Sequence, residues 1–423
     1  MSPVLSSTAR TIGIRRRHAR QSTATLFPVS PYATSPKPRA GHSPDGTRDV
    51  FDKVETSVVA GSGGSTSGCP TADCPPPTSF EAVPRGLVGR AQGRTREAAV
   101  PLVGIARLAA CSPPAESHRK SSERPDYFLL PVKSILNKCN SARVPFDWTI
   151  NPYRGCEFGC LYCYARYTHE YMEMDGRDFE KKIYVKQDAG PLAGRDLGME
   201  KVQGEHIAIG TATNPYQPAE REFGATRAIL EQMAARKGLS ISITTKSDQV
   251  LRDVDLLRRI GEHSGVSVNL SITTMRTRLA RILEPRAPRP DLRMHAVREL
   301  RRAGIAAGVF AMPVLPGITD REEDLDALAS AARDAGAQWF AASVLFLMPS
   351  AQKQFLPFLD VKFPRLAKRY RDWFTRAAYA PETYRREISA RVAALRKKYG
   401  LGVRPFDPGR PQERDRQLSL ELQ

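Results

Sequence analysis

The 423-residue chain lacks any long apolar run. No stretch of about 18 consecutive apolar residues occurs, so no membrane-spanning helix is expected. The N-terminus also lacks the continuous apolar core of a secretory signal. Cysteine is scarce, with 7 residues in the whole chain, which argues against a disulfide framework. A reducing, cytoplasmic location with cysteines available for a metal site is the better interpretation.

Acidic residues are outnumbered in this chain. Its 45 Asp and Glu residues face 64 Lys and Arg residues, which gives a formal net charge of +19. A charge of this size favours contact with polyanions, and nucleic acid is the commonest such partner. The alternative is a solvated basic surface that follows from an arginine-biased composition.

Residues 1–124 contain little that could form a core. Ser, Thr, Pro, Gly and Arg dominate, and no acidic residue precedes Asp45. Such a segment buries too little apolar surface to offset its ordering entropy, so a disordered low-complexity extension is expected. The basic run Arg15–Arg17 also resembles part of an organellar transit peptide, and a start codon assigned too far upstream is a further alternative.

From residue 125 onward, short apolar runs alternate with helical patterns. The candidate strands are residues 147–150, 206–210, 240–245, 266–272, 306–314 and 338–346. One intervening segment begins with a capping-box pattern at Thr319–Glu322 and places Leu325, Leu328 and Ala332 on one face. Six strand–helix units predict a parallel sheet but are too few for a complete barrel of eight. An α/β partial (β/α)6 TIM-type barrel over residues 125–348 is expected, and a doubly wound sheet also fits.

Residues 349–404 are predicted to form a basic, helical C-terminal segment. One helix is expected near Arg365–Ala378, and a second is expected from Pro381 to Tyr399, with Gly400 at its end. The second helix carries an apolar stripe that should pack against the sheet, formed by Tyr384, Ile388, Val392 and Leu395. Residues 405–423 are expected to be a flexible tail.

A cysteine motif directly follows the first candidate strand. It reads Asn151-Pro-Tyr-Arg-Gly-Cys156-Glu-Phe-Gly-Cys160-Leu-Tyr-Cys163-Tyr-Ala-Arg166. Ligand sites of α/β sheets lie beyond the carboxyl ends of strands, and Gly155 and Gly159 let the loop wrap around a bound group. Iron–sulfur clusters usually have four thiolate ligands. The three cysteines of C-x3-C-x2-C would leave one iron of a [4Fe–4S] cluster open to a small chelating cofactor.

A zinc site is the alternative interpretation of these cysteines. Zinc needs a fourth ligand. His169 and Cys139 are the nearest candidates, and neither has a familiar zinc spacing relative to the three cysteines. The ligand chemistry therefore favours an iron–sulfur cluster.

The motif, with an aromatic residue before its last cysteine, resembles that of the radical S-adenosylmethionine (SAM) superfamily. Asn151–Cys156 and Cys163–Arg166 look like the spore-photoproduct-lyase-related branch, and the resemblance extends over residues 132–346. It implies a partial (β/α)6 barrel that holds a [4Fe–4S] cluster and SAM. An electron donor such as flavodoxin or ferredoxin is implied as well.

The resemblance also assigns expected roles to individual residues. Cys156, Cys160 and Cys163 would ligate the cluster and be essential for catalysis. The residues expected to contact SAM, or to lie beside it and the substrate, are Tyr162, Tyr164, Thr213, Lys246 and Ser271. Glu220 and Glu284 have plainer interpretations, as the start of a helix and as a surface acid.

One departure from the lyase pattern affects the expected reaction. The lyase carries a hydrogen-donating cysteine after its second strand, whereas this chain has Ala212 and Thr213 there. The same photoproduct repair is therefore not expected, although radical generation is. SAM would chelate the open iron and be cleaved reductively to a 5′-deoxyadenosyl radical, which abstracts hydrogen from a substrate. Nucleic acid is the favoured substrate; a peptide, a small molecule or a non-enzymatic iron–sulfur or zinc nucleic-acid-binding protein are the alternatives.

The extreme C-terminus carries one further motif. Gln417–Leu422 resembles the short peptides by which bacterial replication and repair proteins bind the sliding clamp. Its alternating Leu418, Leu420 and Leu422 could anchor an extended tail in an apolar groove. A chance apolar tail, or a short strand packed on its own domain, explains the pattern equally simply.

Overall fold

A seven-stranded sheet forms the centre of the computed structural model, which describes residues 104–115, 125–140 and 144–403. Its strands, in spatial order, are β10 (Phe340–Val344), β9 (Ala306–Val314), β8 (Gly265–Ser271), β7 (Ser240–Thr245), β6 (His206–Ile209), β3 (Trp148–Ile150) and β2 (Leu136–Lys138). All neighbours from β3 to β10 are parallel, and only β2 pairs antiparallel, with β3. All six candidate strands are therefore present.

The strand order settles which of the two expected architectures is correct. Each parallel strand is added to the same side of the one before it, so the order runs from β3 to β10 without reversal. A doubly wound sheet would reverse direction at a switch point. The fold is a partial (β/α)6 barrel, and the doubly wound alternative is wrong.

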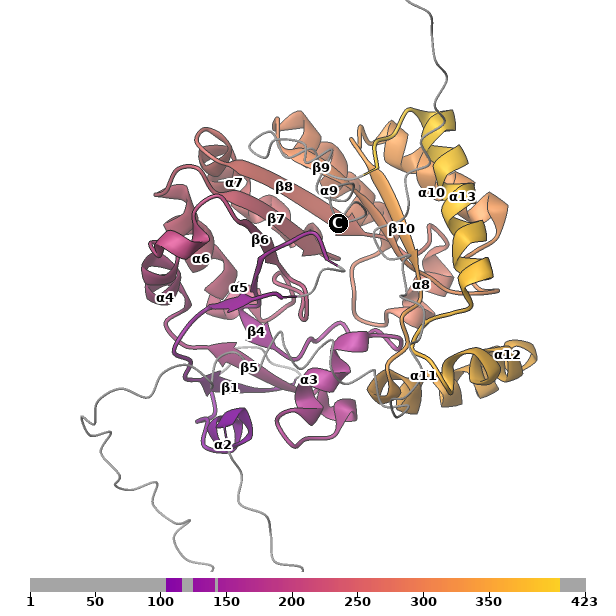
Figure 1. Cartoon of the computed structure of the whole chain (residues 1–423), viewed down its shortest axis with the longest axis horizontal. Coiled ribbons are helices and arrows are strands. Elements are labelled where there is room, and N and C mark those ends of the chain that lie inside the picture. The colour runs from indigo at the N-terminus through magenta and orange to yellow at the C-terminus, as the bar shows by residue number, and fades with distance from the viewer. Residues whose placement is uncertain (1–103, 116–124, 141–143, 404–423) are drawn as a thin grey trace, which may run out of the picture.

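Helices cover the outer face of this sheet (Figure 1). They are α4 (Ala189–Asp196), α6 (Ala225–Ala234), α7 (Val254–Gly261), α9 (Pro290–Arg302), α10 (Glu322–Asp334) and α13 (Glu382–Tyr399). Their apolar stripes join the strands in one core, as expected for Leu325, Leu328 and Ala332 of α10. Shorter connecting elements are η2 (Tyr164–Arg166), α3 (Tyr167–Glu170), η3 (Gly176–Asp178), η4 (Glu200–Val202), α5 (Glu220–Phe223), η5 (Asp248–Asp253) and α8 (Thr277–Leu283).

A second, small sheet was not predicted. It consists of β1 (Asp126–Leu130), β5 (Lys182–Lys186) and β4 (Tyr153–Arg154), with β5 in the centre. Figure 1 shows it beside the main sheet, on the side where α3 lies. Because β4 belongs to the cysteine motif, this sheet holds one end of the cysteine loop.

The expected boundary at residue 124 is wrong for residues 104–115. Helix α2 (Gly104–Ala110) packs Ala109 against Leu130 in a small apolar cluster. The Ala115 amide then donates to the Tyr127 carbonyl at 2.7 Å. The few apolar residues of α2 are enough to hold the helix in place, because β1 supplies the other side of the apolar cluster. Residues 1–103 lie outside the described part of the chain.

The C-terminal segment contains three helices rather than two. The expected pair corresponds to α12 (Pro364–Phe374) and α13, and α11 (Pro349–Lys362) precedes them. Gly400 ends α13 in the left-handed conformation, with φ of 65°, and Ile388, Val392 and Leu395 are buried as predicted. Helix α11 packs Phe355 and Leu359 into a second apolar cluster that includes Cys156 and Cys160. No helix within the described ranges combines the length and apolar character needed to span a membrane.

Candidate active site

The cysteine loop lies at the carboxyl ends of the parallel strands, directly after β3. Cys156 and Cys160 are buried, and Cys163 is half-buried. The Cys163 amide donates to the Cys160 carbonyl at 3.2 Å, so the last two cysteines share a tight turn. The loop therefore brings three thiols to the end of the barrel where ligands of this fold class bind.

Hydrogen bonds from the neighbouring strand connection hold the first half of the loop. Gln217, which follows β6, accepts from the Glu157 amide at 2.9 Å and donates to the Gly155 carbonyl at 3.1 Å. The end of α8 holds the second half, where the Leu161 amide donates to the Leu283 carbonyl at 3.1 Å. The loop is thus fastened to two other parts of the barrel.

Gly155 allows the loop to approach the small sheet closely. Its φ is +81°, and an added Cβ would lie 2.6 Å from the Lys182 carbonyl oxygen. Any side chain here would force this backbone apart. The glycine is therefore required by both conformation and space.

Arg166 is a fully buried cation just beyond the last cysteine. Its guanidinium donates to the Cys160 carbonyl at 3.1 Å, to the Gly176 carbonyl at 3.0 Å and to Glu180 at 2.6 Å. It joins the loop to the segment that leads into β5. The motif ended at Arg166 in the sequence, but nothing there indicated that this side chain is buried.

Burial controls the protonation of the three thiols. It raises the pKa of Cys156 to about 12 and raises the pKa of Cys160 and Cys163 as well. Lys246 opposes this effect at Cys160, and Arg166 opposes it at Cys163. Without a bound cation the thiols are therefore protonated near neutral pH, and metal binding would release their protons.

A buried polar network lies beside Cys160. Lys246 follows β7 and donates to the Tyr162 hydroxyl at 2.9 Å and to Glu284 at 2.8 Å. Thr273 also donates to Glu284, at 2.8 Å, and the Tyr162 hydroxyl forms a short hydrogen bond with the same carboxylate. On its far side Glu284 forms an ion pair with fully buried Arg293 at 2.5 Å.

Glu284 is ionised in this network. Burial alone would raise its pKa, but Arg293 and Lys246 outweigh burial and hold the pKa well below the ordinary value. Burial and the Glu284 charge together raise the pKa of Tyr162, so its hydroxyl remains protonated. The carboxylate therefore fixes both the ammonium of Lys246 and the ring of Tyr162 at the edge of the cysteine loop.

The structure places the other expected contact residues around the same loop. Thr213 accepts from Gln217 at 3.4 Å, and Ser271 ends β8, where its carbonyl accepts from Arg293 at 3.0 Å. Tyr164 donates to the Thr211 carbonyl, so its ring lies toward the β6 end of the site. Tyr162 belongs to the loop and Lys246 donates directly to its hydroxyl, whereas Thr213 and Ser271 connect to the loop through intermediate side chains.

Sequence reasoning missed several residues that build this site. Glu284 was expected to be a surface acid, but its side chain is 1% exposed. Thr273, Arg293 and Gln217 had no role assigned. Among these residues, only the burial of Glu284 could have been inferred from the sequence, because Glu284 follows the apolar pair Ile282–Leu283 that ends α8.

His169 and Cys139, the candidate fourth zinc ligands, lie elsewhere. The His169 Nε2 is 3.0 Å from the Lys182 carbonyl oxygen and its ring packs against Phe179, while burial lowers its pKa to about 4. The Cys139 amide donates to Asp147 at 2.8 Å, at the opposite end of β3 from the cysteine loop. Within the described residues, no three His, Cys, Asp or Glu side chains surround a single metal-ion position.

Comparisons with known proteins agree with the fold and the loop. The radical SAM superfamily model matches residues 150–329. An uncharacterised protein of Mycobacterium tuberculosis is 37% identical over 280 residues, which is 65% of this chain and 82% of the relative. An uncharacterised protein of Methanocaldococcus jannaschii is 32% identical over 184 residues, 43% of this chain and 66% of that protein. A spore photoproduct lyase variant superposes with a TM-score of 0.50 at 13% identity, covering 73% and 86% of the two chains.

The chain belongs to the radical SAM superfamily and is a radical SAM enzyme. Its cofactors are those of the superfamily, a [4Fe–4S] cluster and SAM. The donor set fits a cluster of this kind, because two buried thiols and one half-buried thiol lie on one short loop, and thiolates are the usual ligands of iron–sulfur clusters.

Proposed function

We propose that Cys156, Cys160 and Cys163 ligate the [4Fe–4S] cluster and that the enzyme cleaves SAM reductively to act on nucleic acid. The observation that carries this proposal is that two buried thiols and one half-buried thiol share one loop with the Lys246–Glu284 pair beside it. When bound, the cluster supplies an electron to SAM and so yields a 5′-deoxyadenosyl radical.

The protein's own residues would bind and orient SAM. Lys246 offers a half-buried cation suited to the SAM carboxylate, and Glu284 keeps that cation in place. Thr213 and Ser271 offer polar contacts, and Tyr162 and Tyr164 offer aromatic surfaces. The apolar cluster around the loop, including Phe355 and Leu359 of α11, would exclude water from the reactive centre.

A nucleic-acid substrate is supported by two observations. The net charge of +19 favours a polyanionic partner. The fold is also shared with spore photoproduct lyase. The resemblance of the sequence implies a hydrogen-donating cysteine after the second strand, where this chain has Ala212 and Thr213, so a different transformation of nucleic acid is proposed. The clamp-binding role of Gln417–Leu422 remains a proposal, because those residues lie outside the described ranges.

The cellular setting follows from the cofactor. Radical SAM enzymes need an electron donor, and we propose a flavodoxin or ferredoxin for this role. We place the enzyme in the cytoplasm, where the free cysteines of the described chain stay reduced.

Anaerobic reconstitution tests the cluster assignment. The full chain should bind about four irons, as a [4Fe–4S] site does, and release 5′-deoxyadenosine when reduced with SAM present. Replacing any one of Cys156, Cys160 and Cys163 by Ala should abolish both properties, whereas the matched control Cys139→Ala should retain them. Stoichiometric zinc without SAM cleavage would overturn the proposal.

Crosslinking tests the substrate class. Ultraviolet crosslinking in cells, followed by purification of the protein and identification of the attached material, should recover nucleic acid. Recovery at the level of a mock purification would remove nucleic acid from the proposal and leave the cluster assignment intact.

A further inference from the structure

The end of α8 is joined to the cysteine loop by two backbone hydrogen bonds. The Leu161 amide donates to the Leu283 carbonyl at 3.1 Å, and the Arg286 amide donates to the Phe158 carbonyl at 3.2 Å. The two loop residues lie on either side of Cys160 in the sequence. The segment that ends α8 is therefore in direct backbone contact with the middle of the loop that is proposed to hold the cluster.

Arg286 also reaches the loop with its side chain, although the residue is exposed. Its guanidinium lies beside Gly159, where Nη2 is 3.1 Å from the position that a Cβ atom on this glycine would take. Gly159 is buried and directly precedes Cys160. A cation at the protein surface therefore contacts the residue next to a proposed cluster ligand.

The surface around Arg286 is basic. Between residues 276 and 289 the chain carries five arginines and one acid, and that acid, Glu284, is 1% exposed. Two of the arginines, Arg276 and Arg289, form ion pairs with aspartates. The other three are exposed and form no ion pair within the part of the chain that the structure describes: Arg278, Arg281 and Arg286.

Ile282 adds an apolar contact to this arginine surface. It is 40% exposed, and it follows Arg278 by four residues, so the two share one face of α8. The Arg281 guanidinium donates to the Pro285 carbonyl at 2.6 Å, which ties it to the segment that leads to the loop. Arginines around an apolar residue are typical of protein–protein interfaces, so the surface favours a protein partner that carries carboxylates.

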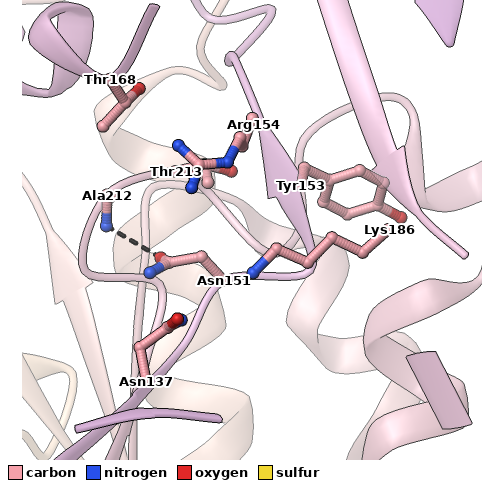
Figure 2. Close-up of a pocket in the computed structure, with 8 residues that line it drawn as sticks. All are labelled: Asn137, Asn151, Tyr153, Arg154, Thr168, Lys186, Ala212 and Thr213. Carbon is pink, nitrogen blue, oxygen red and sulfur yellow. Dashed lines mark hydrogen bonds between the residues drawn. The ribbon is translucent and has the colours of Figure 1, made fainter. Parts of the chain in front are cut away.

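The first residues of the cysteine motif offer no comparable approach. Asn151 and Tyr153 are buried, and Asn151 accepts from the Ala212 amide at 2.8 Å. Figure 2 shows them among Asn137 of the main sheet and Lys186 of the small sheet. On this side a partner would meet the side chains of both sheets before the loop, whereas at α8 it would lie on residues that contact the loop.

We propose that Arg278, Arg281 and Arg286, together with Ile282, form the docking surface for the electron donor. The inference rests on the proposed function, in which the cluster takes up one electron for each SAM cleaved. The partner is a small electron-transfer protein with an acidic surface around a flavin or an iron–sulfur cluster; it is oxidised by one electron as the enzyme's cluster is reduced by one. Electron transfer slows steeply with distance, so the donor has to dock on residues that touch the loop. Carboxylates on the donor would complement the arginines and speed its association.

Titration of two acidic donors onto the reconstituted full chain tests this surface. The probes are a bacterial flavodoxin and a plant-type ferredoxin, and wild type should bind at least one of them, more weakly at high salt. The double variant Arg278→Glu, Arg286→Glu should bind at least about ten-fold more weakly, because each reversal replaces an attraction by a repulsion. The matched control is Arg259→Glu, the same reversal at an exposed arginine of α7, which lies away from α8 in Figure 1. It should bind as wild type does.

Reversal at Arg286 also changes the surroundings of Gly159, so two further variants accompany the double variant. Arg278→Glu alone should weaken binding about three-fold, half of the full effect on a logarithmic scale. Arg286→Lys keeps the charge and should bind within about two-fold of wild type. All variants should hold about four irons. They should release 5′-deoxyadenosine at the wild-type rate with dithionite, a small reductant that needs no docking surface.

The outcomes separate this inference from the proposed function. If wild type releases no 5′-deoxyadenosine with dithionite, the proposed function fails, and the docking surface is judged by the titration itself. If wild type binds neither donor, if the double variant binds as wild type does, or if Arg259→Glu loses as much affinity, the docking surface is overturned. Unchanged donor affinity together with lost binding of a single-stranded DNA oligonucleotide in the double variant would assign the arginines to nucleic acid instead.

Discussion

Glu220 and Glu284 are two buried glutamates with the same kinds of primary contact but different surroundings. Each accepts from a tyrosine hydroxyl and forms an ion pair with an arginine. The remaining contacts of Glu220 are backbone amides, those of Thr226 at 2.8 Å and Arg227 at 3.1 Å. Glu220 therefore accepts hydrogen bonds from the first turn of α6 and stabilises the fold there.

The remaining contacts of Glu284 are side chains that face the cysteine loop. Lys246 and Thr273 both donate to it at 2.8 Å, and Lys246 also reaches Tyr162. The same chemical group thus stabilises the fold in one place and holds a cation beside Cys160 in the other. Burial alone does not separate the two roles, but the identity of the remaining partners does.

The largest effect is expected for Glu284→Gln. The substitution leaves Arg293 and Lys246 buried beside an uncharged amide, so the free energy of unfolding should fall by about 3–5 kcal/mol. Displacement of Lys246 should also slow SAM cleavage about 100-fold per bound cluster. Denaturant unfolding and 5′-deoxyadenosine release measure the two effects. A wild-type rate per cluster would show that Glu284, like Glu220, only supports the fold.

Glu220→Gln provides the matched contrast. Arg252 keeps a second partner, Asp253 at 2.8 Å, so the free energy of unfolding should fall by about 3 kcal/mol, the lower end for a broken buried pair. SAM cleavage per bound cluster should stay within about two-fold of wild type, because none of these Glu220 partners lies between Cys156 and Cys163. The same pair of assays applies, and a large loss of rate would break the comparison.

His169 tests the opposite case, a buried group that is held neutral. Burial lowers its pKa to about 4, whereas an unfolded histidine titrates near 6.5. Between these values the unfolded chain binds a proton that the folded chain does not. Stability should therefore fall as pH decreases, by about 2 kcal/mol between pH 7 and pH 5. Unfolding curves of wild type and His169→Gln should differ by this pH dependence; parallel curves would contradict it.

The smallest effect is expected for an exposed ion pair whose contact is as short as that between Glu284 and Arg293. Arg371 and Asp360 are 2.5 Å apart, and both side chains are 46% exposed. Asp360→Asn should change the free energy of unfolding by less than about 1 kcal/mol, because solvent screens the pair. Thermal unfolding at two salt concentrations measures it. A loss as large as that of Glu220→Gln would mean that burial is not what distinguishes these pairs.

The barrel and the cysteine loop were predictable because they depend on local patterns. The six parallel strands are short apolar runs at regular spacing, and Gly400 ends α13 in the left-handed conformation that glycine commonly adopts after a helix. Even so, the capping box expected at Thr319 does not form. The Thr319 hydroxyl accepts from the Leu315 amide at 2.8 Å instead, and α10 begins without a side-chain cap.

The small sheet and the Glu284 network depend on contacts between distant segments. The two residues of β4 have no strand signature of their own and pair with β5 about 30 residues later. Glu284 meets Tyr162, 122 residues earlier, and Lys246, 38 residues earlier, only because the barrel brings the end of α8 to the cysteine loop. No sequence pattern in these segments predicts those contacts. The sequence could therefore indicate the ligands of the site, but not the residues that position them.

The hydrogen bonds that the loop amides of Glu157 and Leu161 donate to Gln217 and Leu283 also bear on the order in which the holoenzyme is assembled. In small zinc domains the metal is needed for folding, so removal of the metal denatures them. Here a core that extends across the sheet and hydrogen bonds with Gln217 and Leu283 shape the loop, so we expect the polypeptide to fold before it receives its iron. Iron delivery must then reach thiols that are already buried, and loss of the cluster should leave an intact apoprotein that can be refilled.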